Sequence, residues 1–193
     1  MDSAFMAHLR DLATANDVAL IFDEVQCGLG RTGALFAHEH FNVTPDIMTL
    51  AKPLAGGLPM GAVLVTEKIA SCLKVGDHAT TFGGGPLVSA VAHAVVQHIA
   101  DPAFLGEVKG KGEMLAKSLG QLTLLGKVKE IRGIGMMWGI ELTEAAAPYM
   151  ARAFDAGLLI TTAGENVLRL LPPLVVNTQD IENAIQAITE VLQ

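Results

Sequence analysis

The sequence predicts an α/β fold whose sheet is mostly parallel. An amphipathic helical pattern over residues 3–16 is followed at once by the apolar run Val18–Phe22, which together make half of an α/β unit. A second short apolar run, Ile47–Ala51, is bounded by turn residues, as is typical of buried strands in parallel sheets. An apolar helix is predicted over Leu87–Ile99. Short apolar strands that alternate with helices favour an α/β domain.

The other elements expected in the first half follow in chain order. The first helix has apolar residues at helical spacing, and Ser3 is placed to cap it. Thr44–Asp46 is a turn before the second strand, and Gly61–Thr66 is a third strand that could pair beside it. A glycine-rich loop, Asp77–Pro86, precedes the apolar helix. Hydroxyls and backbone amides at a helix start can cradle a phosphate, and an ordinary flexible loop is the alternative.

A break at Asp101-Pro102 separates two regions of different composition. We expect residues 1–100 to be part of a large domain and residues 101–193 to form a small α+β domain. The charged helical pattern after the break needs no ligand to explain it. The elements expected there are helices over Phe104–Leu124 and Ala145–Asp155, strands within Val128–Leu142, over Gly157–Ile160 and around Arg169, and a last helix capped by Thr178.

Composition and charge argue against several classes of protein. Hydrophobic residues make up 51% of the chain and charged residues 17%, so the chain can bury a sizeable core. A formal net charge of −7 argues against nucleic acid as a ligand. The two cysteines, Cys27 and Cys72, form neither a disulfide framework nor a metal motif. No signal peptide and no apolar run of membrane-spanning length is evident, so we expect a cytoplasmic protein without a membrane partner.

Each of the two apolar strands ends near one charged side chain, Asp23 or Lys52. Ligands of open parallel sheets bind beyond the carboxyl ends of the strands. Pyridoxal phosphate needs a lysine for its aldehyde and an aspartate that faces its pyridine nitrogen. A lysine near apolar walls and a cationic ring loses basicity and becomes a usable nucleophile. Taken alone, Asp23 could equally be a turn or capping aspartate, and Lys52 a solvated charge.

The sequence around these two residues resembles that of the fold-type I, class III aminotransferases. The segment at Asp23 reads FDEVQCGLGRTG, beside the family's FDEVQTGxGRTG, and the lysine segment reads TLAKPLAGGLPMGAVL. The resemblance continues through TTFGGGPL, RGIGMMWGIEL and ENVLRLLPPL, and thus over essentially the whole chain. Members of the family are about twice as long as these 193 residues, so the chain resembles their C-terminal half, with only part of the large domain.

The resemblance implies that the chain is an enzyme, with pyridoxal phosphate as cofactor and roles for five residues. Lys52 would carry the cofactor aldehyde, and Asp23 would face the ring nitrogen. Val25 would pack against the ring, and Gln26 would bond near its phenolic oxygen. Thr81, or less directly its neighbour Thr80, would reach the cofactor phosphate of a neighbouring subunit. A shared phosphate site of this kind implies a homodimer.

The resemblance also implies the substrates. Arg169 matches a family arginine of the small domain that meets a substrate carboxylate, with a structural ion pair as the alternative. The sequence motifs most resemble those of enzymes whose amino donor is N-acetylornithine, with 2-oxoglutarate as the acceptor. Ornithine, succinylornithine and 4-aminobutyrate are alternative donors. A related aminomutase is an alternative kind of enzyme. The family's other half brings a phosphate loop, an aromatic that stacks on the ring and a further arginine. A truncated, non-catalytic fragment is therefore also an open alternative.

Two other patterns suggest different ligands. Gly28, Gly30 and Gly33 form a literal G-x-G-x-x-G, the spacing of dinucleotide-binding loops. In dinucleotide-binding loops the glycines follow their strand directly, whereas here Asp23–Gln26 intervenes and no helix clearly begins inside the motif. His38 and His40 flank a glutamate without further ligands at metal spacing, so no metal site is expected.

Overall fold

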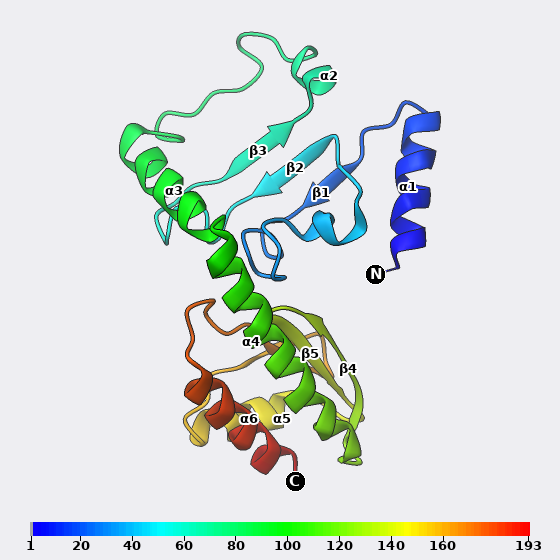
Figure 1. Ribbon diagram of the computed structural model, residues 1–193, viewed down its shortest axis with the longest axis vertical. Coiled ribbons are helices and arrows are strands. Elements are labelled where there is room, and N and C mark those ends of the chain that lie inside the picture. The colour runs from blue at the N-terminus through cyan, green and yellow to red at the C-terminus, as the bar shows by residue number, and fades with distance from the viewer. Residues whose placement is uncertain (1) are drawn as a thin grey trace. The chain divides into compact units, whose positions relative to one another are not determined.

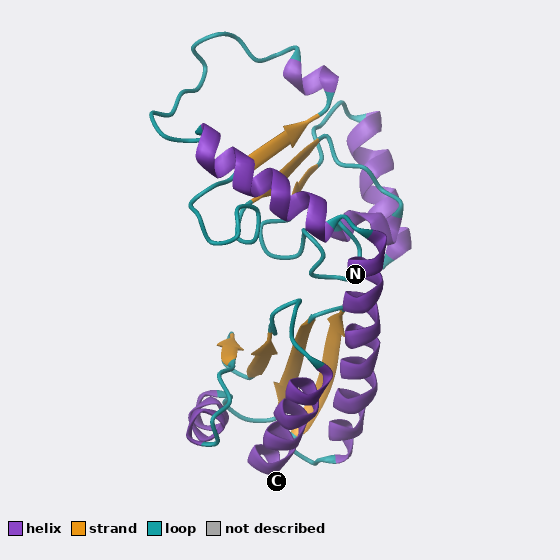
Figure 2. Cartoon of the chain, turned by 60° about the vertical axis from the view of Figure 1, so that its left-hand side comes forward, coloured by secondary structure: helices purple, strands orange, loops and turns teal. Residues whose placement is uncertain are grey.

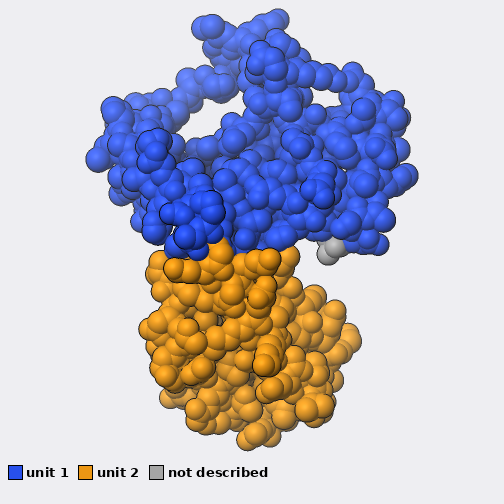
Figure 3. Space-filling model, in the orientation of Figure 1, with its two compact units in different colours: residues 1–105 blue, residues 106–193 orange. Residues whose placement is uncertain are grey.

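The computed structural model describes residues 2–193. The chain divides into two compact units, residues 1–105 and 106–193, which Figure 3 shows in two colours. We call them unit 1 and unit 2. The division falls within helix α4, Pro102–Gly120, just beyond the boundary expected at residue 100. That these units correspond to a large and a small domain stays a prediction.

Unit 1 contains a three-stranded sheet in the order β1-β2-β3 (Figure 1). Strands β1, Ile21–Asp23, and β2, Ile47–Leu50, are parallel, whereas β3, Ala62–Val65, runs antiparallel to β2. The third strand thus pairs beside β2, the strand that precedes Lys52, and the sheet of this chain is mixed. Helices α1, Ser3–Ala15, α2, Glu67–Ala70, and α3, Pro86–Ile99, and the 3-10 helix η1, Ala37–Phe41, complete the unit.

The core of unit 1 lies where β2 and the turn after it meet α3. Residues of β2 alternate between half-buried and buried, as expected for a strand with one face on the core. Burial then continues past the strand end, because Leu54 and Ala55 are only 5% and 1% exposed. The cluster consists of Leu29, Met48, Leu50, Leu54, Ala55, Ala92 and Ile99. The turn that carries Lys52 is therefore anchored by buried residues on both sides.

Unit 2 is built on an antiparallel sheet in the order β4-β5-β7-β6 (Figure 2). Its β4–β5 hairpin turns at Gly135, whose φ of 54° favours glycine. In β7, Leu168 and Leu170 are buried, and Arg169 between them belongs to the other face of the strand. The elements after α4 are η2, Gln121–Leu124, β4, Val128–Ile134, β5, Met137–Leu142, α5, Ala147–Asp155, β6, Thr161–Ala163, β7, Val167–Leu170, and α6, Thr178–Leu192.

Three local expectations were wrong. Helix α1 is capped by Asp2, whose side chain accepts from the Ala4 N–H, and Ser3 is its first residue. Helix α6 is capped by Asn177 in the same way, and Thr178 is its first residue. Aspartate and asparagine cap as well as serine and better than threonine, so a neighbour outcompeted each expected cap. The strand expected over Gly157–Ile160 is β6, three or four residues later, because the chain first turns at Gly157 with a φ of 80°.

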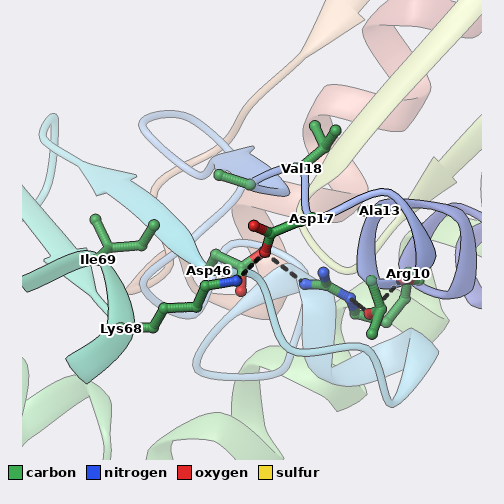
Figure 4. A pocket seen from close by; sticks show the side chains of 9 residues that line it. Arg10, Ala13, Asp17, Val18, Asp46, Lys68 and Ile69 are labelled. Atoms are coloured by element: carbon green, nitrogen blue, oxygen red, sulfur yellow. Dashed lines mark hydrogen bonds and ion pairs between the residues drawn. The ribbon is translucent and has the colours of Figure 1, made fainter. Parts of the chain in front are cut away.

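Asp46 ties the amino ends of β1 and β2 to helix α1 (Figure 4). Its Oδ2 accepts from the Leu20 N–H and from Arg10 Nη1, each at 2.8 Å. The Leu20 N–H, and next Arg10, lower the pKa of the Asp46 carboxyl below 3.8. The nearby pair of Lys68 with Asp17 is highly exposed and contributes little to stability.

The lowered pKa of Asp46 predicts a pH dependence of stability. The ionised carboxylate stabilises unit 1 above its unfolded-state pKa, and this contribution is lost as pH falls through the lower folded-state pKa. We expect the free energy of unfolding, measured in urea between about pH 7 and pH 3 where carboxyl groups titrate, to fall less on acidification in Asp46→Asn than in the wild type. Equal acid slopes for the two proteins would contradict the assignment.

Candidate active site

The structure brings Asp23 and Lys52 to the same edge of the unit 1 sheet. Asp23 is the last residue of β1 and lies opposite Thr49 in the neighbouring parallel strand. Lys52 follows Thr49 by three residues, in the turn after β2. Parallel strands have their carboxyl ends at one edge, which is where ligands of such sheets bind.

Two hydrogen bonds fix the Asp23 carboxylate. The Val25 N–H and the Thr49 hydroxyl both donate to its Oδ1, each at 3.0 Å. Among residues 2–193 no hydrogen bond to Oδ2 is formed. The side chain of Asp23 is exposed in this chain. Asp23 is thus a carboxylate that is oriented through one oxygen and open through the other.

Lys52 is an exposed lysine on an anchored turn. Within the described chain its ammonium group has no hydrogen bond and no ion pair. The following Pro53 restricts the backbone of Lys52, and Gly56 and Gly57 turn the chain with φ of 60° and 106°. The backbone of Lys52 is therefore restrained, and its amine has no partner in the described chain.

The residues expected to contact a cofactor lie in two separate loops of unit 1. Val25 and Gln26 are half-buried in the turn directly after β1. Thr81 is exposed in the glycine-rich loop before α3, and no described contact joins it to Asp23 or Lys52. The neighbouring Thr80 hydroxyl accepts from the Gly83 N–H at 3.1 Å, so the loop itself uses Thr80 and leaves the Thr81 hydroxyl available.

Arg169 lies in unit 2 and is half-buried on β7. Its Nε donates to the Thr161 hydroxyl at 3.2 Å across the β6–β7 pair. No described carboxylate lies within ion-pair distance of the guanidinium. The ion-pair alternative therefore has no partner among residues 2–193, and the terminal nitrogens remain available for an anion.

Sequence analysis assigned no role to Glu24, which is 3% exposed. Its carboxylate accepts from the Ala37 N–H at 2.6 Å and from the His38 N–H at 2.9 Å. It is also 2.8 Å from His38 Nδ1. The partners are the first two residues of η1, 13 and 14 residues further along the chain, so no local pattern around Glu24 could reveal them.

The glycine motif has a structural explanation in the same turn. A Cβ on Gly28 would lie 2.8 Å from the carbonyl oxygen of Glu24, so no side chain fits there. Gly30 and Gly33 have φ of 83° and 84°. No helix begins within Gly28–Gly33, so the requirement for a dinucleotide-binding loop is not met.

The two cysteines, both free, differ in accessibility. Cys27 is half-buried, and burial, followed by the charge of Glu24, raises the pKa of its thiol. Cys72 is exposed. Since the thiolate is the reactive form, we expect iodoacetamide at about pH 8, just below a free thiol's pKa, to label Cys72 first and Cys27 several-fold more slowly. Peptide mapping over time measures the two rates, and faster labelling of Cys27 would contradict the structure.

Comparison with known proteins identifies the family. A family model described as aminotransferase class-III matches residues 1–192. The chain belongs to the class-III aminotransferases. Among curated members, the mitochondrial acetylornithine aminotransferase of Alnus glutinosa is 50% identical over 97% of this chain and 42% of its own length. The acetylornithine aminotransferase of Methanocaldococcus jannaschii is 44% identical over 98% of the chain and 48% of its own length.

Solved class-III structures confirm the fold. An N-acetylornithine aminotransferase from Stenotrophomonas maltophilia has a TM-score of 0.87 at 33% identity, covering 98% of this chain and 51% of that protein. An ornithine aminotransferase from Plasmodium yoelii has a TM-score of 0.92 at 27% identity, covering 99% and 52%. The predicted fold-type I architecture is therefore correct. The chain spans about half the length of the relatives it matches.

No group of histidine, cysteine and acidic side chains in residues 2–193 is arranged to hold a metal ion. No helix in that range is long and apolar enough to cross a membrane.

Proposed function

We propose that this class-III chain takes part in pyridoxal-phosphate-dependent amino transfer. The observation that carries the proposal is the unpartnered Lys52 at the same sheet edge as Asp23, whose Oδ2 is open. An amine and an anion are the two groups that this cofactor requires of a protein. When bound, pyridoxal phosphate supplies an aldehyde and a ring that withdraws electrons.

Each candidate residue has a role that its environment fits. Lys52 would hold the cofactor through its aldehyde, and Asp23 would face the protonated ring nitrogen. Val25 covers the ring, and Gln26 donates near its phenolic oxygen. Thr81 holds the phosphate of a neighbouring subunit. The homodimer that this implies is supported by exposed apolar side chains beside Thr81, including Phe82 and Leu87, which are 89% and 73% exposed.

Lys52 also moves the proton in this proposal. The Lys52 amine would act as the base that takes a proton from the substrate carbon that bears nitrogen, and as the acid that gives the proton back. The donor carbon loses two electrons and becomes a carbonyl, and 2-oxoglutarate gains the electrons and the amino group to become glutamate. The two half reactions therefore balance without a further oxidant.

The donor proposed is N-acetylornithine, the pathway proposed is arginine biosynthesis, and the compartment proposed is the cytoplasm. It is supported by the names of the curated relatives at 44% and 50% identity. Ornithine is the alternative that the Plasmodium relative's name supports, and succinylornithine and 4-aminobutyrate complete the set to test. The test is a single-turnover assay in which each donor is mixed with cofactor-loaded chain and the cofactor absorbance is followed. The proposal expects the fastest change with N-acetylornithine, and no change with any donor would refute amino transfer by this chain alone.

Arg169 is proposed to hold a carboxylate of 2-oxoglutarate. Lysine keeps the charge but loses the planar, bidentate fork of arginine. We expect Arg169→Lys to weaken 2-oxoglutarate binding by about tenfold, close to 1.4 kcal/mol, and to leave cofactor binding unchanged. Isothermal titration with 2-oxoglutarate measures this, with Arg152→Lys in α5 as a matched control. Unchanged affinity in Arg169→Lys would remove Arg169 from the substrate site.

A non-catalytic role is the second candidate, favoured by the coverage of about half of each relative. We propose that segments present only in the longer relatives complete the site. The 193-residue chain should then bind cofactor weakly and turn over slowly, if at all. Steady-state turnover of the purified chain measures this. Rates in the range common for enzymes, roughly 1–1,000 per second, would show that the chain needs no further segment.

A further inference from the structure

We propose that Glu24 is a positioning residue that holds the site turn, Asp23–Gly28, in the geometry that cofactor binding requires. The inference rests on the proposed function, because it concerns the same cofactor site. Glu24 itself does not face that site, since its side chain is buried with 3% exposure. It acts through the residues on either side of it.

The side chain of Glu24 clamps the site turn to a distant segment. Its two oxygens accept backbone N–H groups of Ala37 and His38 and face the His38 ring nitrogen. These three contacts are 2.6, 2.9 and 2.8 Å long. A buried carboxylate with three donors has its hydrogen bonds satisfied. Moving the carboxylate away would leave buried donors without hydrogen-bond partners, so the side chain resists displacement.

The backbone of Glu24 clamps the site turn to β2. Its N–H donates to the Thr49 carbonyl at 3.0 Å. The Thr49 hydroxyl donates to Asp23 Oδ1 at the same distance. Thr49 thus binds two successive residues of the turn, and a rotation of Glu24 would pull directly on the bond that orients Asp23.

The other end of the turn depends on Glu24 as well. Its carbonyl oxygen accepts from the Gly28 N–H at 3.0 Å, and a Cβ at Gly28 would lie 3.0 Å from Glu24 Oε2. Val25 and Gln26 lie between these two fixed points. The positions of both proposed ring contacts are therefore set by the packing of Gly28 against the Glu24 side chain.

The His38 ring connects Glu24 to Phe22, the residue of β1 that precedes Asp23. Its centroid is 6.2 Å from that of Phe22 and 5.7 Å from that of Phe36, with which it is stacked. The contact of Nδ1 with Glu24 fixes the orientation of the ring between these two aromatic residues. Phe22 precedes Asp23 in β1, so the contacts of Glu24 hold the strand end from both sides.

The decisive experiment compares Glu24→Gln with Asp46→Asn in the full chain. Both variants replace a carboxylate of unit 1 that accepts a backbone N–H, but Asp46 serves the opposite ends of the strands. Three readouts are used: the dissociation constant of pyridoxal phosphate, the absorption spectrum of the bound cofactor, and amide hydrogen exchange of Val25, whose N–H donates to Asp23. Urea unfolding gives the free energy of unfolding of each variant, so that an effect on the site can be separated from a general loss of stability.

We expect Glu24→Gln to weaken cofactor binding by about 10- to 100-fold, the range found when a partner that orients a binding group is removed. The Val25 amide should exchange faster. The absorption bands of the cofactor should shift, because the Asp23 carboxylate would lose its orientation toward the ring nitrogen. Asp46→Asn should change none of these three readouts when the two variants are compared under conditions of equal unfolding free energy. Equal behaviour of the two variants would overturn the inference and make Glu24 a purely structural residue.

A second variant keeps the inference testable if Glu24→Gln does not fold. His38→Phe retains an aromatic ring against Phe22 and Phe36 and removes only the ring nitrogen that faces Glu24. It should move the same readouts in the same direction by a smaller factor, and no movement would overturn the inference. If the wild type takes no cofactor at Lys52, the proposed function fails, and Val25 exchange alone then decides whether Glu24 holds Asp23.

Discussion

Replacing Lys52 with alanine should abolish the specific binding of pyridoxal phosphate to this chain. The reason is chemical, because the cofactor aldehyde needs an amine and Lys52 is the exposed amine at the sheet edge with Asp23. Any measurable amino transfer should fall by about three orders of magnitude or more, as when a covalent catalyst is removed. Absorption spectra of the purified variant with added cofactor measure the first effect, and single-turnover mixing measures the second.

Lys68→Ala is the matched control for Lys52→Ala. Lys68 is also highly exposed, at 70% of its side chain, but it pairs with Asp17 near the amino ends of the strands. Its removal should leave the cofactor spectrum unchanged. Both variants should unfold at the same urea concentration as the wild type, since neither side chain supports the core. An unchanged spectrum in Lys52→Ala would show that the amine lies elsewhere.

Replacing Asp23 with asparagine should weaken cofactor binding by about a hundredfold. Asparagine can still accept from the Val25 N–H and the Thr49 hydroxyl through its Oδ1, so the turn should keep its geometry. The change removes only the charge that would face the protonated ring. Loss of one partner from a covered ion pair costs about 3 kcal/mol or more, which is roughly a hundredfold in affinity.

Titration of Asp23→Asn with pyridoxal phosphate by absorbance measures this loss of affinity. Asn42→Asp, a charge change of opposite sign in the loop after η1, serves as the control and should leave the affinity unchanged. If Asp23→Asn binds as tightly as the wild type, Asp23 does not meet the cofactor ring. Asp23 would then be the turn aspartate that local sequence alone equally allowed.

Much of the unit 1 sheet could be predicted because its signals are local. The apolar runs that became β1 and β2 are short and bounded by turn residues, and parallel pairing brings their carboxyl ends to one edge. The placement of Asp23 and Lys52 at that edge follows from these two features. The cap of α1 at Asp2 and the late start of β6 were missed because caps and turns depend on competition between neighbouring residues.

The environment of the site could not be predicted in the same way. The exposure of Asp23 is a matter of which surfaces cover it, which local pattern does not record. The burial of Glu24 depends on partners at Ala37 and His38 in η1, 13 and 14 residues away. Gly28 looked like part of a nucleotide-binding motif, whereas the close approach of Glu24 explains why a glycine stands there. Such contacts between residues that are distant in the sequence become visible only in three dimensions.

The most direct test of the account is to map where pyridoxal phosphate attaches to the wild-type chain. The chain is incubated with cofactor, reduced with borohydride and digested, and the modified lysine is identified by mass spectrometry. Because exposed lysines also react with aldehydes, the distribution of label decides the result. We predict that Lys52 carries most of it at cofactor concentrations that leave Lys68 and Lys74 unmodified. Label spread over exposed lysines without preference for Lys52, or no label at all, would contradict the account.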